Sequence, residues 1–181
     1  LEIARAREAG DPRLVSGLVS DGTLRRFLTE AAVDGAAGTR TVTGDVQLIG
    51  CELIAADCDA GYDVLHVAMT GSHRVAQLSA DASTAPEVVR RGKVVELDEV
   101  WTFVRRLSAG GGKGHLADGK CPSCGAPVER AAVTSCEHCR AILNSGEHDW
   151  VLAGVREGPE FFCRLRASIP RWPELRARDA E

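Results

Sequence analysis

Apolar residues in the first forty positions recur with the period of a helix, and we predict three helices there. The first covers residues 1–9 and stops at a glycine. The second covers residues 11–20, because Asp11 is a good N-cap and a proline follows it at the first helical position. The third begins at Ser20 or Asp21 and ends at a pair of glycines. Its apolar stripe consists of Leu24, Phe27, Leu28 and Ala31.

After residue 40 the period of the apolar positions changes to two, which is typical of strands with one buried face. The four strands are expected at residues 41–55, 62–70, 94–107 and 149–155. Residues 57–61 would form the hairpin turn between the first two, and a change of side-chain parity predicts a bulge or bend at Gly50. Residues 79–86 have the composition of a loop. These elements predict an α+β protein with helices packed on one face of a curved four-stranded antiparallel sheet.

Two Cys-x-x-Cys pairs, eleven residues apart, lie between the last two predicted strands. Their members are Cys121, Cys124, Cys136 and Cys139. Two residues between thiolates let a tight turn aim both sulfurs at one ion, so the spacing predicts a tetrahedral Zn²⁺ site. Two disulfides or a thioredoxin-like redox pair fit less well, because a redox motif needs one pair at a strand-to-helix junction. With four thiolates the site has no open position, so the zinc would be structural. His138 could replace one ligand but is more simply an exposed loop residue.

Composition and charge narrow the class of protein. The chain has 181 residues, a net charge of −4 and 44% hydrophobic residues, which suits one globular domain with a small insert. The cysteine segment is electrically neutral and lacks aromatic residues, so no nucleic acid is expected as a partner. Neither an apolar run of eighteen residues nor a secretory leader is recognisable, so we expect no membrane-spanning segment in this chain.

Three more cysteines remain, and an odd number favours a reducing compartment such as the cytoplasm. Cys51 alternates with apolar residues and is expected to be buried, while Cys58 and Cys163 lie nearer segment ends. None is given a catalytic role.

Three motifs follow one another in the second half of the chain: Asp98–Arg106 (DEVWTFVRR), the CPSCG turn that begins at Cys121, and Asp149–Leu152 (DWVL). On these motifs, residues 1–157 resemble the translocase of inner membrane 44-like domain family, in the nuclear transport factor 2-like superfamily. More specifically, the chain looks like the bacterial branch of that family, in which a zinc ribbon interrupts the strands. Arg140 and His148 depart from the pattern, which more often has Gly and Tyr there.

The resemblance implies a cone-shaped nuclear transport factor 2-like fold with an apolar groove between helices and sheet. Its domain would be discontinuous, over residues 1–110 and 147–158, with an inserted zinc ribbon over 115–146 and a C-terminal tail over 159–181. Mitochondrial members are peripheral membrane proteins that tether a chaperone motor or a ribosome at a protein-insertion channel. By resemblance, this chain would be a noncatalytic docking domain for a protein partner or a lipid. Membrane association would come from a segment outside this sequence.

Aromatic residues are the candidate binding residues. Trp101 and Phe103 share one face of the third predicted strand and would line the groove, or else belong to the core. In the tail, Phe161, Phe162 and Trp172 alternate with arginines, which suits a partner or an anionic membrane surface. A closing strand is an equally good interpretation of the tail.

The alternative function is a small-molecule enzyme of the isomerase or dehydratase type that uses the cone pocket. Candidates for proton transfer would be Tyr62, Asp63, His66 and Glu99. Paired carboxylates, a nucleophile motif and a phosphate-binding loop are not evident, so we predict that the chain is not an enzyme. A ligand-sized cavity with a buried polar pair would favour the enzyme, whereas an open groove without one would favour docking.

Overall fold

The computed structural model describes residues 2–82, 86–109, 113–128 and 132–158 of the chain. The helices are α1 (Glu2–Ala9), the 3₁₀ helix η1 (Pro12–Val15), α2 (Asp21–Ala36), α3 (Pro86–Arg90) and the 3₁₀ helix η2 (Leu116–Asp118). The strands are β1 (Thr39–Asp59), β2 (Tyr62–Ser79), β3 (Lys93–Arg106) and β4 (Val151–Glu157). All neighbours pair antiparallel in the order β1-β2-β3-β4. The predicted class, α+β with a four-stranded antiparallel sheet, is therefore confirmed.

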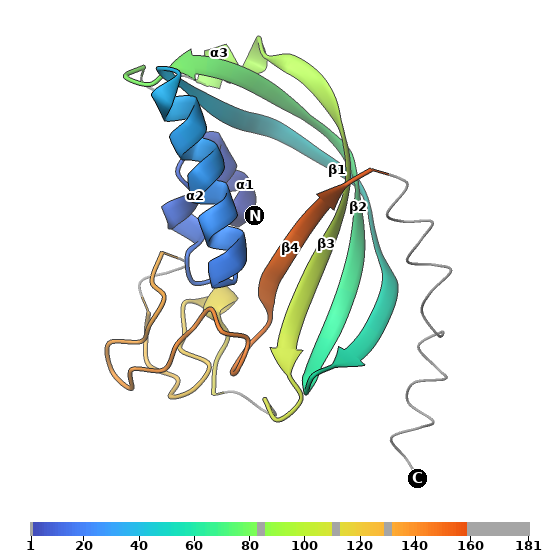
Figure 1. Ribbon diagram of the computed structural model, residues 1–181, viewed down its shortest axis with the longest axis vertical. Coiled ribbons are helices and arrows are strands. Elements are labelled where there is room, and N and C mark those ends of the chain that lie inside the picture. The colour runs from blue at the N-terminus through green and yellow to red at the C-terminus, as the bar shows by residue number, and fades with distance from the viewer. Residues whose placement is uncertain (1, 83–85, 110–112, 129–131, 159–181) are drawn as a thin grey trace.

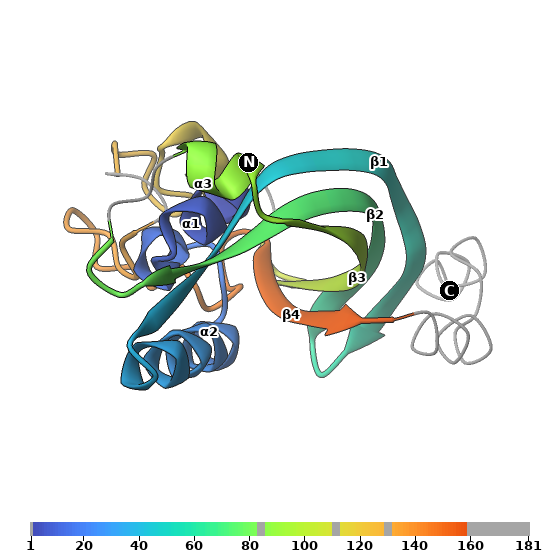
Figure 2. The ribbon, with the colours of Figure 1, turned by 90° about the horizontal axis from the view of Figure 1, so that it is seen from above.

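The sheet is strongly bent, and the two longest helices lie beside one side of it. Figure 1 shows α1 and α2 next to each other, and Figure 2 shows the strands following curved paths that open toward them. Helix α1 contacts β1, whereas α2 contacts both β1 and β4. Because β1 and β4 are the two edge strands, α2 bridges the open side of the curved sheet.

The predicted hairpin between the first two strands is present, but its second strand is longer than predicted. Ala60 and Gly61 form a two-residue turn with φ of 50° and 83°, the left-handed pair typical of a type I′ hairpin. Strand β2 runs on from Thr70 to Ser79 because its backbone pairs with β1 on one side and β3 on the other. Because that stretch contains several polar residues, its apolar positions do not alternate regularly, and the sequence pattern does not predict the strand there.

Strand β1 departs from regular pairing at three places: between Gly44 and Gln47, between Leu48 and Gly50, and between Leu53 and Ala55. The middle irregularity lies at the bulge predicted for Gly50. Bulges bend a strand and increase its twist, so they account for the curvature of the hairpin. The two backbones approach closely at Gly71 of β2, where an added Cβ would clash with the carbonyl oxygen of Gln47.

The prediction of a helix over residues 11–20 is wrong, although the prediction of Asp11 as a cap is correct. Asp11 accepts a hydrogen bond from the Arg13 backbone N–H at 3.0 Å, but only the 3₁₀ turn η1 follows. Residues 16–18 form a turn, and Val19 then forms a parallel bridge with Leu152 of β4. This long-range backbone pairing replaces the helical hydrogen bonds that the local pattern favours.

The third predicted helix is confirmed as α2. The Ser20 hydroxyl caps it by accepting a hydrogen bond from the Thr23 N–H. Helix α3 begins at Pro86, the last residue of the stretch predicted as a loop, and covers residues for which no element was predicted. Among the described residues, none of the helices has the length and apolar character needed to span a bilayer.

The main core cluster lies where α1, η1 and α2 meet β4. Its buried members are Ala6, Val15, Val19, Leu152 and Val155. Trp101 and Phe103 of β3 are half-buried and pack against this cluster, with ring centroids 6.3 Å apart. They share one face of the strand, as the sequence predicts.

Replacing Gly71 tests the close approach that bends the hairpin. Gly71→Ala should lower the free energy of unfolding by about 1–3 kcal/mol, the usual cost of overpacking, measured by urea denaturation. Gly154→Ala in β4 is the matched control, because nothing lies within 4 Å of its added Cβ. Equal losses in both variants would contradict this explanation.

Candidate metal centre and neighbouring cavity

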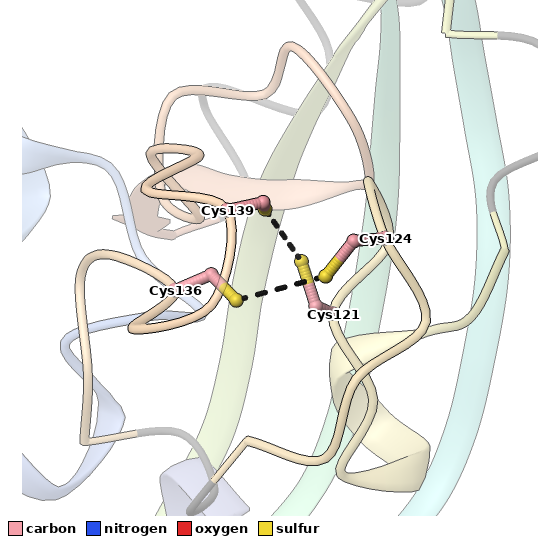
Figure 3. Close-up of side chains that lie close together, drawn as sticks. All are labelled: Cys121, Cys124, Cys136 and Cys139. Carbon is pink, nitrogen blue, oxygen red and sulfur yellow. Dashed lines mark hydrogen bonds between the residues drawn. The ribbon is translucent and has the colours of Figure 1, made fainter.

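Four thiols from two turns converge in the connection between β3 and β4, as Figure 3 shows. The sulfurs of Cys121, Cys124, Cys136 and Cys139 all lie within 4.8 Å of one another. The Cys121 and Cys139 Sγ atoms are 3.7 Å apart, and those of Cys124 and Cys136 are 3.8 Å apart. A tetrahedron with metal–sulfur bonds of about 2.3 Å has sulfur–sulfur edges of about 3.8 Å. The four thiols could therefore hold one metal ion, with spacing consistent with a zinc site rather than with disulfides.

The two turns that present these thiols have the same backbone pattern. The N–H of Gly125 donates to the carbonyl of Cys121, and the N–H of Arg140 donates to that of Cys136, both at 2.8 Å. Gly125 has φ of 80° and Arg140 has φ of 61°, so both lie in the left-handed region. Glycine adopts this conformation freely, whereas a residue with a Cβ pays about 1–2 kcal/mol. Arg140 therefore gives the second turn the same shape as the first, but its left-handed backbone conformation costs energy that a glycine would not.

Backbone N–H groups favour thiolate in both turns. The Ala141 N–H lowers the pKa of the Cys139 thiol to about 7, helped by hydrogen bonds to the other sulfurs and opposed by burial. The Ala126 N–H acts in the same way on Cys124, but burial and the neighbouring sulfurs outweigh it and raise that pKa to about 11. The four sulfurs thus share protons, and a bound cation would displace those that remain.

The metal centre is attached to the rest of the domain by a small apolar cluster and a few polar contacts. Leu116 and Leu143 are buried beside Cys121 and Cys136, and Leu18 packs against the same cluster. The side-chain amide of Asn144 donates to the Asp21 carboxylate at 2.8 Å. The Leu116 N–H donates to the Asp149 carboxylate at 3.2 Å. Because Asp21 is the first residue of α2, the cysteine segment contacts the start of the helix that bridges the sheet.

A cavity of about 570 Å³ lies between α1, α2 and the sheet. Its apolar lining includes Ile3, Ala6, Val15, Phe27 and Val155. Its charged lining consists of Arg7, Arg26, Glu30, Asp34, Glu99, Arg156 and Glu157. The volume is within the usual range for a ligand site, about 300–1,000 Å³.

The deepest charge in this cavity is Glu99 of β3, which is 7% exposed. The Trp101 indole N–H donates to its Oε2 at 2.6 Å, and the Arg7 guanidinium donates to its Oε1 at 3.2 Å. The Arg7 guanidinium also lies 5.8 Å from the centroid of the Trp101 ring. A buried carboxylate is costly unless it is paired and hydrogen-bonded, so Arg7 and Trp101 together make this position tolerable.

His73 of β2 belongs to the same neighbourhood. Burial and the positive charge of Arg7 lower its pKa, while Glu99 and Glu157 oppose that shift. Its Nδ1 is buried and has no hydrogen-bond partner among the described residues. At neutral pH this histidine is therefore uncharged, with one polar atom unused by the part of the protein that is described.

The structure does not bring the predicted catalytic candidates together. Asp63 pairs with Arg105 at 3.1 Å, and the His66 Nδ1 lies 2.9 Å from the Thr102 hydroxyl. Neither they nor Tyr62 line the cavity that contains Glu99. Arg7 was missed by sequence reasoning, because its partner Glu99 lies 92 positions away and no local pattern connects them.

The predicted aromatic binding residues have different outcomes. Trp101 and Phe103 lie in the core beside the cavity but do not line it, so their binding role stays a prediction. Phe161, Phe162 and Trp172 lie outside the described residues, as does Cys163. Cys51 was expected to be buried, but it is exposed, and so is Cys58. Both lie on the edge strand β1, which has a partner on one side only.

No protein-family model, curated protein or solved structure matches this chain.

Removing a thiol tests the metal centre. The purified protein should contain one Zn²⁺ per chain by elemental mass spectrometry, and Cys121→Ser or Cys136→Ser should abolish it. Structural zinc supplies on the order of 10 kcal/mol to small modules, so each variant should lose at least about 3 kcal/mol of unfolding free energy. Cys51→Ser, which removes an exposed thiol far from the cluster in sequence, is the control and should keep its zinc. Full metal content in Cys121→Ser would contradict this assignment.

Proposed function

We propose that this chain is a noncatalytic docking domain, stabilised by an inserted zinc ribbon, that binds a protein partner or a lipid in the cavity between helices and sheet. The observation that carries the proposal is the composition of the cavity lining and the hydrogen bonding of its buried carboxylate. It has an apolar lining, and its one buried carboxylate, Glu99, already accepts hydrogen bonds on both oxygens. Such a site offers contact area, and its buried carboxylate is already engaged by Arg7 and Trp101 rather than free to act as an acid or base.

The spacing of the four sulfurs supports zinc, and the number of ligands supports a structural role. Four protein thiolates complete the tetrahedron, so water has no coordination position. The segment that carries them has few apolar residues of its own, chiefly Leu116, Val128, Val133 and Leu143. Metal binding would therefore supply stability that this small core does not. Placing the module between β3 and β4 leaves the pairing of those strands intact.

Membership of the translocase of inner membrane 44-like domain family is part of this proposal. The DEVWTFVRR motif lies in β3, and the DWVL motif leads into β4, with the cysteine turns between them. A bent sheet with helices beside its open side is compatible with a nuclear transport factor 2-like cone. By this likeness, the domain would act in the cytoplasm in membrane-associated protein transport or assembly.

Crosslinking from inside the cavity tests docking. With benzoylphenylalanine in place of Phe27, which lines the cavity, irradiation in cells should capture one reproducible partner from the membrane or soluble fraction. The same substitution at Val33, on the same helix but 65% exposed and outside that cavity, is the control and should not capture it.

The captured partner should then be purified and its affinity measured. Phe27→Ala should weaken binding by at least about tenfold, as expected for a buried aromatic contact, whereas Val33→Ala should not. Unfolding free energies of both variants show whether the fold is intact. No specific partner from position 27 would count against docking.

The enzyme remains the second candidate. Arg7 and the buried Glu99 form an ion pair in the lining of a ligand-sized cavity, and the buried Nδ1 of nearby His73 has no partner among the described residues. Isomerases and dehydratases move a proton from carbon, so incorporation of solvent deuterium into a panel of small carbonyl and hydroxyl compounds would reveal them. Under the docking proposal, no incorporation is expected. Incorporation that Glu99→Gln lowers by a factor of about 100 or more, the usual contribution of a general base, would establish the enzyme instead.

A further inference from the structure

The charges of the cavity do not cancel once the internal pairs are counted. Arg7 pairs with Glu99, and Arg26 pairs with Glu30 at 3.3 Å. The lining has four carboxylates against three guanidinium groups: Glu30, Asp34, Glu99 and Glu157 against Arg7, Arg26 and Arg156. Among the described residues, the Asp34 carboxylate accepts a hydrogen bond from the Thr41 backbone N–H and forms no ion pair. The opening therefore carries an excess of negative charge above an apolar lining.

Strand β4 ends at this acidic opening. The last residues of β4, from Val155 to Glu157, line the cavity, and Gly158 follows with φ of 96°, which only glycine adopts easily. Three or four residues span at most about 10–14 Å. A chain that turns back toward the helices after Gly158 can therefore bring residues 161 and 162 into the cavity.

The sequence that follows has the complementary chemistry. Residues 161–173 contain three arginines and no acidic residue. They also contain five large apolar residues, namely Phe161, Phe162, Leu165, Ile169 and Trp172. Aromatic side chains gain most from an apolar lining, and arginines beside them would meet the unpaired carboxylates.

We propose that residues 161–173 of this chain occupy the cavity, with Phe161 or Phe162 on its apolar lining and Arg164 and Arg166 near Asp34 and Glu157. The tail is then an intramolecular competitor, and a partner enters only when it displaces this segment. This inference deepens the proposed docking function and rests on it. An acyl chain is a poorer occupant, because it would desolvate these charges without pairing them.

Crosslinking from the tail of the full chain tests this placement. Phe162→benzoylphenylalanine should give, after irradiation, crosslinks within one chain to peptides from α1 and α2. Ile49→benzoylphenylalanine, at a position that is 84% exposed on β1, is the control and should not link to those helices. The double substitution Arg164→Glu and Arg166→Glu should lower the yield of these crosslinks by about threefold, the effect expected from losing one surface ion pair. Added salt should lower the yield in the same way, because it screens exposed charges.

Crosslinks elsewhere overturn the inference. Crosslinks to different surfaces of the same chain would place the tail elsewhere, and crosslinks found only in covalent dimers would make it an intermolecular arm. Crosslinks to α1 and α2 that disappear on adding phosphatidylserine vesicles would support the placement and identify an anionic membrane, instead of a protein, as what displaces the tail. A partner still captured from position 27 while the tail links elsewhere would refute only this inference. A tail that links to the cavity with no partner found would refute docking instead.

Discussion

The backbone pairing between residues 18–20 and the start of β4 holds three parts of this protein together. The Leu152 N–H donates to the Leu18 carbonyl, and the Ser20 N–H donates to the Leu152 carbonyl, both at 2.9 Å. Leu152 is fully buried in the core, and Ser20 caps α2. The same few residues therefore set where α2 begins, where β4 begins and where the cysteine segment ends.

The candidate metal centre acts on the same junction from the other side. Leu18 packs against the clusters of both the helical core and the cysteine segment, and Asn144 holds the first residue of α2. A segment with so small a core would not keep these contacts by hydrophobic burial alone. If the thiols bind zinc, the energy of metal binding also supports the start of a helix that lines the cavity.

The cavity combines apolar lining with charges that are mostly satisfied internally. Glu99 is held by Arg7 from α1 and by Trp101 from its own strand, so the ion pair ties the first helix to the sheet. A carboxylate in this role is a structural anchor, because removing either partner would leave a buried charge. Asp34 and Glu157 also line the cavity and form no ion pair among the described residues, so under the proposed placement of the tail they select its arginines without the full cost of burial.

Local chemistry was readable from the sequence alone. The spacing of four cysteines, the Ser20 cap of α2, the turn at residues 57–61 and the bulge at Gly50 each depend on atoms a few residues apart, and all are found as predicted. Tertiary structure decided what depends on distant partners. Residues 11–20 lost their helix to pairing with β4, β2 gained nine residues beyond Thr70 by pairing on both sides, and Arg7 met Glu99 across 92 positions. Local patterns do not encode such contacts, because their free energy comes from surfaces that exist only once the chain has folded.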